Sequence, residues 1–425
     1  MEQKKEEPSR DESRSKTNSK ELAKAAFVFI ILMSIMSLFN DMTFEGANGA
    51  LGAFESYLGA PTLAIAAVSG VGTLLGCALR MVSGYFTDKT KKYWAFTIVG
   101  YCIDVFSVPL LALVPDGGWQ LAIVFVLTEK IGKAIKKPAK SSLMSFAAHE
   151  TGEGKSFAIA EALDQIGATI GPMILTLVYT VGSSLTQYQK YVVGFAVLGI
   201  PALICILLLV LSRIQFPAPD AFETKQKEKI GSFYKSKAYL LFVIAAFFFA
   251  AGYMDSFSLI DKHLADLSLM DSNLLPLLYS YAMFIDAISA LVFGYLFDHI
   301  GFLSVGIASL LSAPYAYFFF VPNTNLTLVF FGLTSWGIGI GAIESILQTG
   351  VSRLSKKEER ARAYGFFELV YVVSSFAFSF LLSYLFDNNR QLLCALSLTF
   401  VLIGTLLFFL CEPAYRKEQK SAVAN

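Results

Sequence analysis

Charged residues are scarce in this sequence. Asp, Glu, Lys and Arg make up only 16% of the 425 residues, whereas about a quarter of the residues of a typical soluble domain are charged. This scarcity argues against an ordinary cytosolic enzyme. The net charge of +1 gives no general attraction for nucleic acid, so we expect no nucleic-acid partner.

Residues that build metal and cofactor sites are also few. The five cysteines lie in or beside apolar stretches, and the three histidines (His149, His263 and His299) are far apart in the sequence. This pattern supports neither a disulfide framework nor a metal site. No Gly-x4-Gly-Lys-Ser/Thr loop occurs, so ATP is not the expected energy source. No nucleophile–base arrangement can be argued, and we expect no enzyme, no cofactor and no metal.

Apolar residues, by contrast, are abundant. They form 55% of the chain, which has 38 Phe, 31 Gly and a mean hydropathy of +0.58. A helix needs about 20 apolar residues to cross a lipid bilayer, and no strand-like alternation suggests a barrel. The sequence therefore predicts an all-α polytopic membrane protein with twelve transmembrane helices. The predicted spans are residues 23–46, 62–87, 93–114, 118–138, 156–181, 190–212, 238–259, 273–297, 302–321, 326–348, 361–386 and 391–411.

The distribution of Lys and Arg predicts the orientation. With the N-terminus inside, 28 of the 34 basic residues fall in cytoplasmic segments, and only Lys190, Lys262 and Arg390 fall in external loops. Such a bias is the positive-inside signal. We expect a multi-pass protein of the plasma (inner) membrane with both termini in the cytoplasm. The polar residues 1–22 are expected to be a disordered tail rather than a signal peptide.

The chain contains an internal repeat. The segment Gly84-Tyr85-Phe86-Thr87-Asp88 ends the second span, and Gly294-Tyr295-Leu296-Phe297-Asp298 ends the eighth. Two further pairs follow the same order: Asp41 with Asp255, and Glu161 with Glu368. Because the longest polar interruption lies between the sixth and seventh spans, the repeat predicts two six-helix halves. The predicted divisions are a tail (1–22), an N-terminal half (23–212), a linker (213–237), a C-terminal half (238–411) and a second tail (412–425).

With these motifs, the chain after residue 22 resembles the major facilitator superfamily. The loop signature of that family after its second span has a Gly, an Asp four residues later, and then basic residues and a Gly. Here it is Gly84, Asp88, Lys89 and Lys92, with Lys91 where the family usually has Gly. A second, degenerate copy contains Gly294, Asp298 and Gly301. The resemblance implies twelve helices in two pseudo-symmetric halves and a transport function.

The resemblance also implies a role for this signature as a cytoplasmic gate. Asp88 would meet the N-terminus of the eleventh span near Ala361 in the outward-facing state, where the helix dipole favours a carboxylate. Arg80 lies two turns earlier on the same face and would join this gate. The alternative for Asp88 is an ordinary cap on a solvated helix end.

The fifth span contains Asp164, Gly167, Gly171 and Pro172. The Gly-x3-Gly-Pro spacing is similar to the antiporter motif of the drug/proton exporter branches, although Met173 to Thr176 replace the Gly pair that completes it. Small-residue packing with a kink would explain the same residues.

Ionisable residues inside the spans are candidates for the transport site, because charge at membrane depth is costly. Asp41, Asp255 and Asp286 are the first candidates for reversible protonation, with Asp104 and Glu129 next. On the fourth span, Lys130, Lys133, Lys137 and Lys140 share one helical face. Lys137 and Lys140 are expected to be anchors at the membrane surface. Lys130 and Lys133 are deeper, and either neutralise acids such as Glu129 and Asp104 or attract an anionic solute.

These observations favour a monomeric secondary transporter of a small organic solute that works by alternating access. We expect protons to be the coupling ion, and the fifth-span motif favours export over uptake. The alternatives are a proton-coupled importer of a nutrient or anionic metabolite, and a non-transporting membrane sensor. A sensor would not need the deep carboxylates.

Overall fold

The computed structural model describes residues 10–151, 153–218, 236–254, 256–341, 346–355 and 360–424. Every regular element in these ranges is a helix, which confirms the predicted all-α fold. The N-terminal half contains α1 (Arg10–Tyr57), α2 (Thr62–Thr90), α3 (Tyr93–Leu110), η1 (Leu111–Leu113), α4 (Trp119–Thr151), α5 (Glu153–Val181), α6 (Gln187–Val197) and α7 (Gly199–Gln215). The C-terminal half contains α8 (Lys237–Gly252), α9 (Ser258–Leu267), η4 (Ser272–Leu274), α10 (Leu275–Ile300), α11 (Phe302–Ser312), α12 (Tyr315–Phe320), α13 (Leu326–Gly341), α14 (Gln348–Leu354), α15 (Arg360–Asn388) and α16 (Arg390–Ala424).

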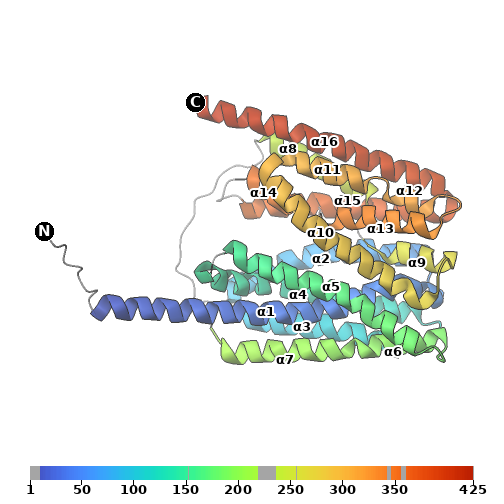
Figure 1. Cartoon of the computed structure of the whole chain (residues 1–425), viewed down its shortest axis with the longest axis horizontal. Coiled ribbons are helices and arrows are strands. Elements are labelled where there is room, and N and C mark those ends of the chain that lie inside the picture. The colour runs from blue at the N-terminus through green and yellow to red at the C-terminus, as the bar shows by residue number, and fades with distance from the viewer. Residues whose placement is uncertain are drawn as a thin grey trace.

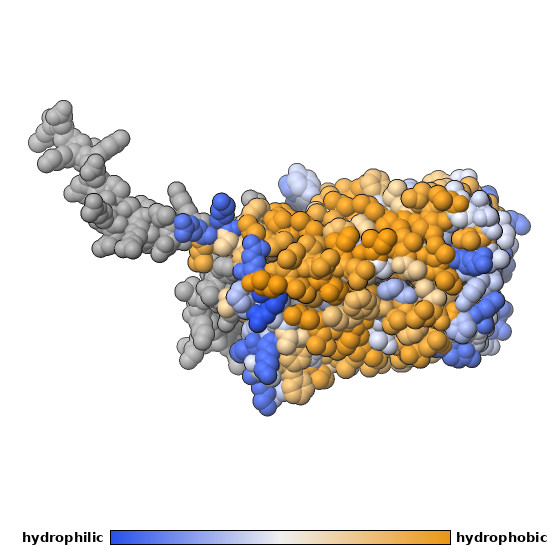
Figure 2. All heavy atoms as spheres, turned by 90° about the horizontal axis from the view of Figure 1, so that it is seen from below, coloured by the Kyte–Doolittle hydropathy of each residue, from blue (hydrophilic) through white to orange (hydrophobic). Residues whose placement is uncertain are grey.

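The surface is that of a multi-pass membrane protein. In the described ranges, nine helical stretches are long and apolar enough to cross a bilayer. The other three predicted spans correspond to α4, which contains several charged residues, to the interrupted pair α8–α9, and to α13, an apolar helix of 16 residues. Figure 2 shows an apolar belt along the molecule, with polar residues at its two ends. A belt of this kind matches the hydrocarbon core of a bilayer.

The helices form two bundles that lie against each other. Figure 1 shows α1 to α7 in one bundle and α8 to α16 in the other. Helix α1 begins and α16 ends at the same end of the molecule, which we call the terminal face; the other end is the opposite face. The bundles meet mainly through α1 with α9, α2 with α15, and α5 with α10. Each bundle therefore contributes one wall to the space between them.

The seventh predicted span is interrupted. Helix α8 ends at Gly252 and α9 begins at Ser258, with Tyr253 in an extended conformation between them. The hydroxyl of Tyr315 donates to the Gly252 carbonyl (3.0 Å) and accepts from the Met254 N–H (2.9 Å). The Ser397 hydroxyl also donates to the Gly252 carbonyl (2.5 Å). These side chains satisfy backbone groups that a break at membrane depth would otherwise leave unpaired.

Glycines bring the helices of the N-terminal half into close contact. A methyl group at Gly171 of α5 would lie 2.7 Å from the Gly46 nitrogen of α1, and one at Gly167 would lie 3.0 Å from the Leu38 carbonyl carbon. Likewise, a methyl group at Gly100 of α3 would lie 2.6 Å from the Lys136 nitrogen of α4. These distances leave no room for a side chain. The α1–α5 and α3–α4 crossings are therefore backbone to backbone.

Three helix boundaries differ from those expected from the sequence. Helix α1 begins at Arg10, so residues 10–22 are helical where the composition predicts a disordered tail. Helix α4 continues through Pro138 to Thr151, and α16 continues beyond residue 411 to Ala424. A polar helix outside the bilayer has no apolar pattern, so hydropathy marks only the part of each helix that lies in lipid.

Candidate functional site

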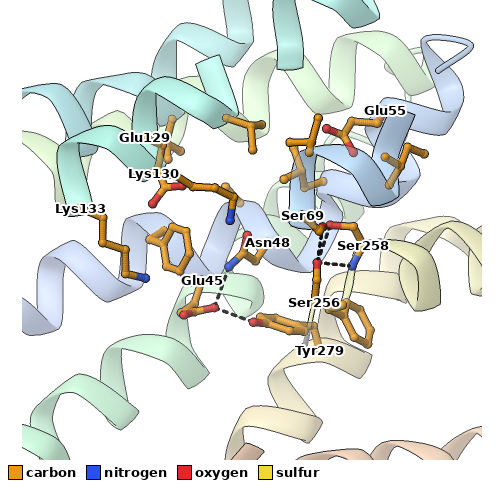
Figure 3. A pocket seen from close by; sticks show the side chains of 18 of the residues that line it. Glu45, Asn48, Glu55, Ser69, Glu129, Lys130, Lys133, Ser256, Ser258 and Tyr279 are labelled. Atoms are coloured by element: carbon orange, nitrogen blue, oxygen red, sulfur yellow. Dashed lines mark hydrogen bonds between the residues drawn. The ribbon is translucent and has the colours of Figure 1, made fainter. Parts of the chain in front are cut away.

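A cavity of about 250 Å³ lies between the two halves. Helices α1 to α4 form one wall, and α10, α13 and the segment that leads into α9 form the other. Figure 3 shows its polar side chains. The lining residues are Phe44, Glu45, Ala47, Asn48, Leu51, Glu55, Ile65, Val68, Ser69, Thr73, Ser107, Val108, Leu111, Phe125, Val126, Glu129, Lys130, Lys133, Ser256, Phe257, Ser258, Tyr279, Met283, Trp336 and Ile340.

The N-terminal wall contains two lysines from α4. The Lys133 ammonium lies 3.5 Å from the centre of the Phe44 ring. The aliphatic chain of Lys130 packs over Gly72 of α2, where an added methyl group would lie 2.7 Å from its Cε. Both lysines extend toward the cavity in Figure 3, and Glu129 lies beside Lys130. The sequence predicted these three residues as cavity residues, and all three line it.

A hydrogen bond between the two halves crosses the cavity. The Tyr279 hydroxyl of α10 donates to Glu45 of α1 (2.5 Å), and the Asn48 amide donates to the same carboxylate oxygen (3.0 Å). A second cross-half bond joins the hydroxyls of Ser69 and Ser256 (2.8 Å). Both contacts must break if the halves separate at this level.

The C-terminal wall is aromatic. The ring of Phe257 lies 4.7 Å from that of Tyr279 and 5.3 Å from that of Trp336, centre to centre. The Trp336 indole N–H donates to the Met254 carbonyl (2.7 Å), and the Tyr253 hydroxyl donates to the Trp336 carbonyl. These bonds hold Trp336 against the interrupted segment between α8 and α9. The wall is therefore a pre-positioned aromatic surface.

The cavity is closed toward the opposite face. A methyl group at Gly52 of α1 would lie 2.7 Å from the Ser258 carbonyl carbon, so the two backbones touch. The Asp261 carboxylate accepts the Ala53 N–H across the same contact (2.6 Å) and is fully buried. Further cross-half bonds nearer this face are Thr62–Asp387 (3.0 Å) and Lys190–Asn273 (2.6 Å).

Known proteins resemble the chain along most of its length. A family model described as Major Facilitator Superfamily matches residues 130–379. The Mycobacterium tuberculosis protein Rv2265 is 30% identical over 394 residues, which cover 91% of this chain and 93% of that protein. The chain belongs to the major facilitator superfamily. The Methanocaldococcus jannaschii MFS-type transporter MJ1317 is 26% identical over 403 residues, covering 92% of this chain and 96% of that protein.

Solved structures of the superfamily share the fold. The nucleoside transporter NupG superposes with a TM-score of 0.68 at 14% identity, covering 91% of this chain and 99% of that one. The peptide transporter POT superposes with a TM-score of 0.68 at 13% identity, covering 91% and 94%. At this identity the likeness concerns the fold alone. Together with the family match, these findings make the protein a membrane transporter of the MFS type and not an enzyme.

The superfamily loop signature lies at the terminal face. Lys89 and Lys92 are exposed there, and a methyl group at Gly84 would lie 3.6 Å from Pro138, which is an ordinary contact. Lys91 occupies the left-handed region (φ 55°) and its N–H donates to the Thr87 carbonyl (2.8 Å). The usual tight turn is thus kept by a lysine where the family has Gly. The Asp88 side chain lies outside the described part of the structure, so its gate role stays a prediction.

Arg80 forms an ion pair with Glu368 of α15, across the two halves. Both side chains are partly exposed. Beyond this pair, a methyl group at Gly294 of α10 or at Gly365 of α15 would meet no atom within 4 Å, and Asp298 is exposed. These positions of α10 and α15 are therefore not packed against another helix, in contrast to Gly52 near the opposite face.

Asp104 forms a buried ion pair inside the N-terminal half. Its partner is Lys136, which also donates to Asn40 (2.7 Å) and lies 4.0 Å from the centre of the Tyr101 ring. Lys136 is one of the 28 basic residues assigned above to cytoplasmic segments, at the end of the predicted fourth span, whereas the structure buries it within α4. Asp41 accepts from the Asn40 amide (2.9 Å) next to this pair. Asp41 and Asp104 do not line the cavity.

The fifth-span motif packs against α1. Asp164 lies 3.9 Å from Lys140, whose ammonium also donates to Ser37. A methyl group on Gly49 of α1 would lie 3.0 Å from the Pro172 Cβ. Lys140, predicted as a surface anchor, is therefore half-buried between helices.

The remaining candidates lie in the C-terminal half. Asp286 is buried (1% exposed) where α10 crosses α13, and it does not line the cavity. Asp255 lies outside the described residues. The residues of this region that were not predicted from the sequence are Glu55, Tyr279, Trp336, Ser256, Ser258 and Asp261. Of these, only the acids carried a usable signal, namely charge near the outer end of a span.

Proposed function

We propose that the protein is a secondary active transporter that moves a small organic solute across the plasma (inner) membrane by alternating access, coupled to protons. The observation that carries the proposal is the cavity between the two halves, which direct contacts between the halves close toward the opposite face. A solute bound there contacts both repeats, so its binding can shift the equilibrium between the inward-facing and outward-facing arrangements of the two halves.

The positive-inside bias supports a cytoplasmic location for both termini. The terminal face is then the cytoplasmic face, and the conformation is inward-facing. The Ala53–Asp261 and Gly52–Ser258 contacts close the external side. In the outward-facing state these contacts would break, and Asp88 would meet α15, as the family motif implies.

Proton coupling requires a carboxyl group that gains and loses a proton during the cycle. Among the candidates from the sequence, Glu129 lines the cavity beside two lysines. We place it ahead of Asp41, Asp255, Asp286 and Asp104 in this role. The Gly171-Pro172 motif supports export.

Transport by everted membrane vesicles and proteoliposomes tests this proposal. Accumulation of a solute from a panel should depend on a pH gradient, and Glu129→Gln should abolish accumulation while it preserves solute exchange, because exchange moves no net proton. The matched variant Glu161→Gln changes an exposed acid on α5 and should leave both modes intact. Gradient-independent transport would rule out proton coupling, and absence of any solute flux would favour the sensor alternative.

A further inference from the structure

Three carboxylates and two lysines line the cavity, and they differ in how far they are exposed to it. Glu55 and Glu129 are 1% and 4% exposed, so their carboxyl groups are covered by protein. The Glu45 carboxylate already accepts hydrogen bonds from the Tyr279 hydroxyl and the Asn48 amide. Lys130 and Lys133 are only half-buried and extend into the open space. A solute that enters therefore meets two ammonium groups first.

Neither lysine forms an ion pair or a hydrogen bond with any residue in the described ranges. Each ammonium group has three donors to satisfy. The Lys133 ammonium packs on the face of the Phe44 ring. The nearby acids attract this ammonium electrostatically but form no ion pair with it. Two cations held at membrane depth are costly unless an anion compensates them. Glu45, Glu55 and Glu129 compensate the two lysine charges through space only, so the donors of both ammonium groups remain available to an anionic group.

The facing wall has different chemistry. Its lining side chains in the described residues are Phe257, Tyr279, Met283, Trp336 and Ile340, with the hydroxyls of Ser256 and Ser258 at one edge. Flat rings favour a flat apolar partner. The cavity volume of about 250 Å³ is below the range of about 300–1,000 Å³ for drug-sized ligands. The occupant is therefore a small metabolite rather than a peptide or a large drug.

We propose that the transported solute is a small organic anion. Its carboxylate or similar oxyanion binds Lys130 and Lys133 of the N-terminal half, and its planar apolar body packs on Phe257, Tyr279 and Trp336 of the C-terminal half. This assignment rests on the proposed transport function. In this arrangement the N-terminal half binds the oxyanion and the C-terminal half binds the apolar body. Only a molecule with both parts therefore bridges the two halves.

Thermal unfolding of the purified full chain, with paired probes, tests the anion class. The probes are benzoate and indole-3-acetate, their uncharged amides, and butyrate as an acid without a ring, each at about 10 mM, because a bound ligand raises Tm in proportion to ln(1 + [L]/Kd). We expect the two aromatic acids to raise Tm, butyrate to act more weakly and the amides to have no effect. Equal shifts with acids and amides, or no shift with any acid, would overturn the proposal.

Variants of α4 assign the effect to the lysines. Lys130→Met and Lys133→Met should each weaken acid binding about tenfold or more, since each removes a charge-assisted hydrogen bond. Lys130→Gln and Lys133→Gln keep a donor and guard against misfolding of the Met variants. The matched control is Lys137→Met, one turn further along α4, where the side chain is exposed. Undiminished acid binding in both Met variants would place the anion elsewhere.

Counterflow in proteoliposomes separates this inference from the transport function. Lysine-dependent binding of acids without any exchange would refute transport and leave the anion site standing. Exchange of the uncharged amides at the rate of the acids would leave transport standing and refute the anion class.

Discussion

The contact between Gly52 and Ser258 makes one glycine a control point for the conformational equilibrium. In the structure, a methyl group at Gly52 would lie 2.7 Å from the Ser258 carbonyl carbon and 2.9 Å from its Cα. Carbon atoms pack at about 3.5–4.0 Å, so α1 and α9 would have to separate by about 1 Å. The atoms that this methyl group would meet are backbone atoms of Ser258, so the clash cannot be relieved by a change of side-chain rotamer.

The magnitude follows from overpacking. Inserting a methyl group into a well-packed contact costs about 1–3 kcal/mol, and the separation would also lengthen the 2.6 Å bond between Ala53 and Asp261. The outward-facing state, in which this contact is broken, escapes both costs. The higher helix propensity of Ala acts on both states and cancels. Gly52→Ala should therefore shift the equilibrium toward the outward-facing state by about 5- to 150-fold.

Distances between spin labels report this shift. One pair at the exposed positions Tyr57 and Leu269 spans the opposite face, and a second pair at Thr90 and His299 spans the terminal face. In Gly52→Ala the first distance should lengthen and the second should shorten.

The control is Gly76→Ala in α2, where an added methyl group meets only the Arg80 guanidinium at 3.9 Å. It should leave both distance distributions unchanged. Wild-type distributions in Gly52→Ala would show that this contact does not close the external side, and our account of closure would be wrong.

Three further outcomes are expected. Lys136→Met should lower the free energy of unfolding by about 3–5 kcal/mol, measured by thermal or denaturant unfolding, because it leaves Asp104 as an unpaired buried charge; adding Asp104→Asn should recover part of the loss. Lys91→Gly should raise the free energy of unfolding by about 1 kcal/mol in the same assay, because the left-handed backbone conformation at this position is unfavourable for any residue except glycine. Asp88→Asn should leave the membrane level of the protein unchanged and slow transport; a normal rate would remove Asp88 from the gate.

The sequence was sufficient for the fold because hydropathy and repeated motifs are local signals. Apolar runs predict spans directly, and the Gly-x3-Asp repeat relates the two halves without any structure. The sequence analysis also found the lysines of the cavity, since charge at membrane depth is conspicuous in an apolar run.

The other cavity wall could not be found in the same way. Tyr279 and Trp336 are aromatic residues in apolar helices, and nothing local distinguishes them from residues that face lipid. Lys136 was assigned to a cytoplasmic segment because Pro138 suggests a helix end, whereas α4 continues to Thr151 and buries Lys136. The close crossing of α3 and α4 at Gly100 is what brings Lys136 within reach of Asp104. Pairings between helices depend on tertiary packing, which hydropathy does not encode.

Among the described residues, ion pairs in the interior are unevenly divided between the two halves. The N-terminal half holds the cavity lysines, together with the Lys136–Asp104 pair and the Lys140–Asp164 contact, which join different helices. The described ion pairs of the C-terminal half, Lys262–Asp266 and Arg416–Glu412, each lie within one helix, and its core is mainly aromatic and aliphatic. Ion pairs are lost when either partner changes its protonation, and apolar packing is insensitive to pH. Acid or alkali should therefore disrupt the N-terminal half first. Two halves that arose as copies of one unit would then unfold in separate steps, in an order set by the denaturing condition.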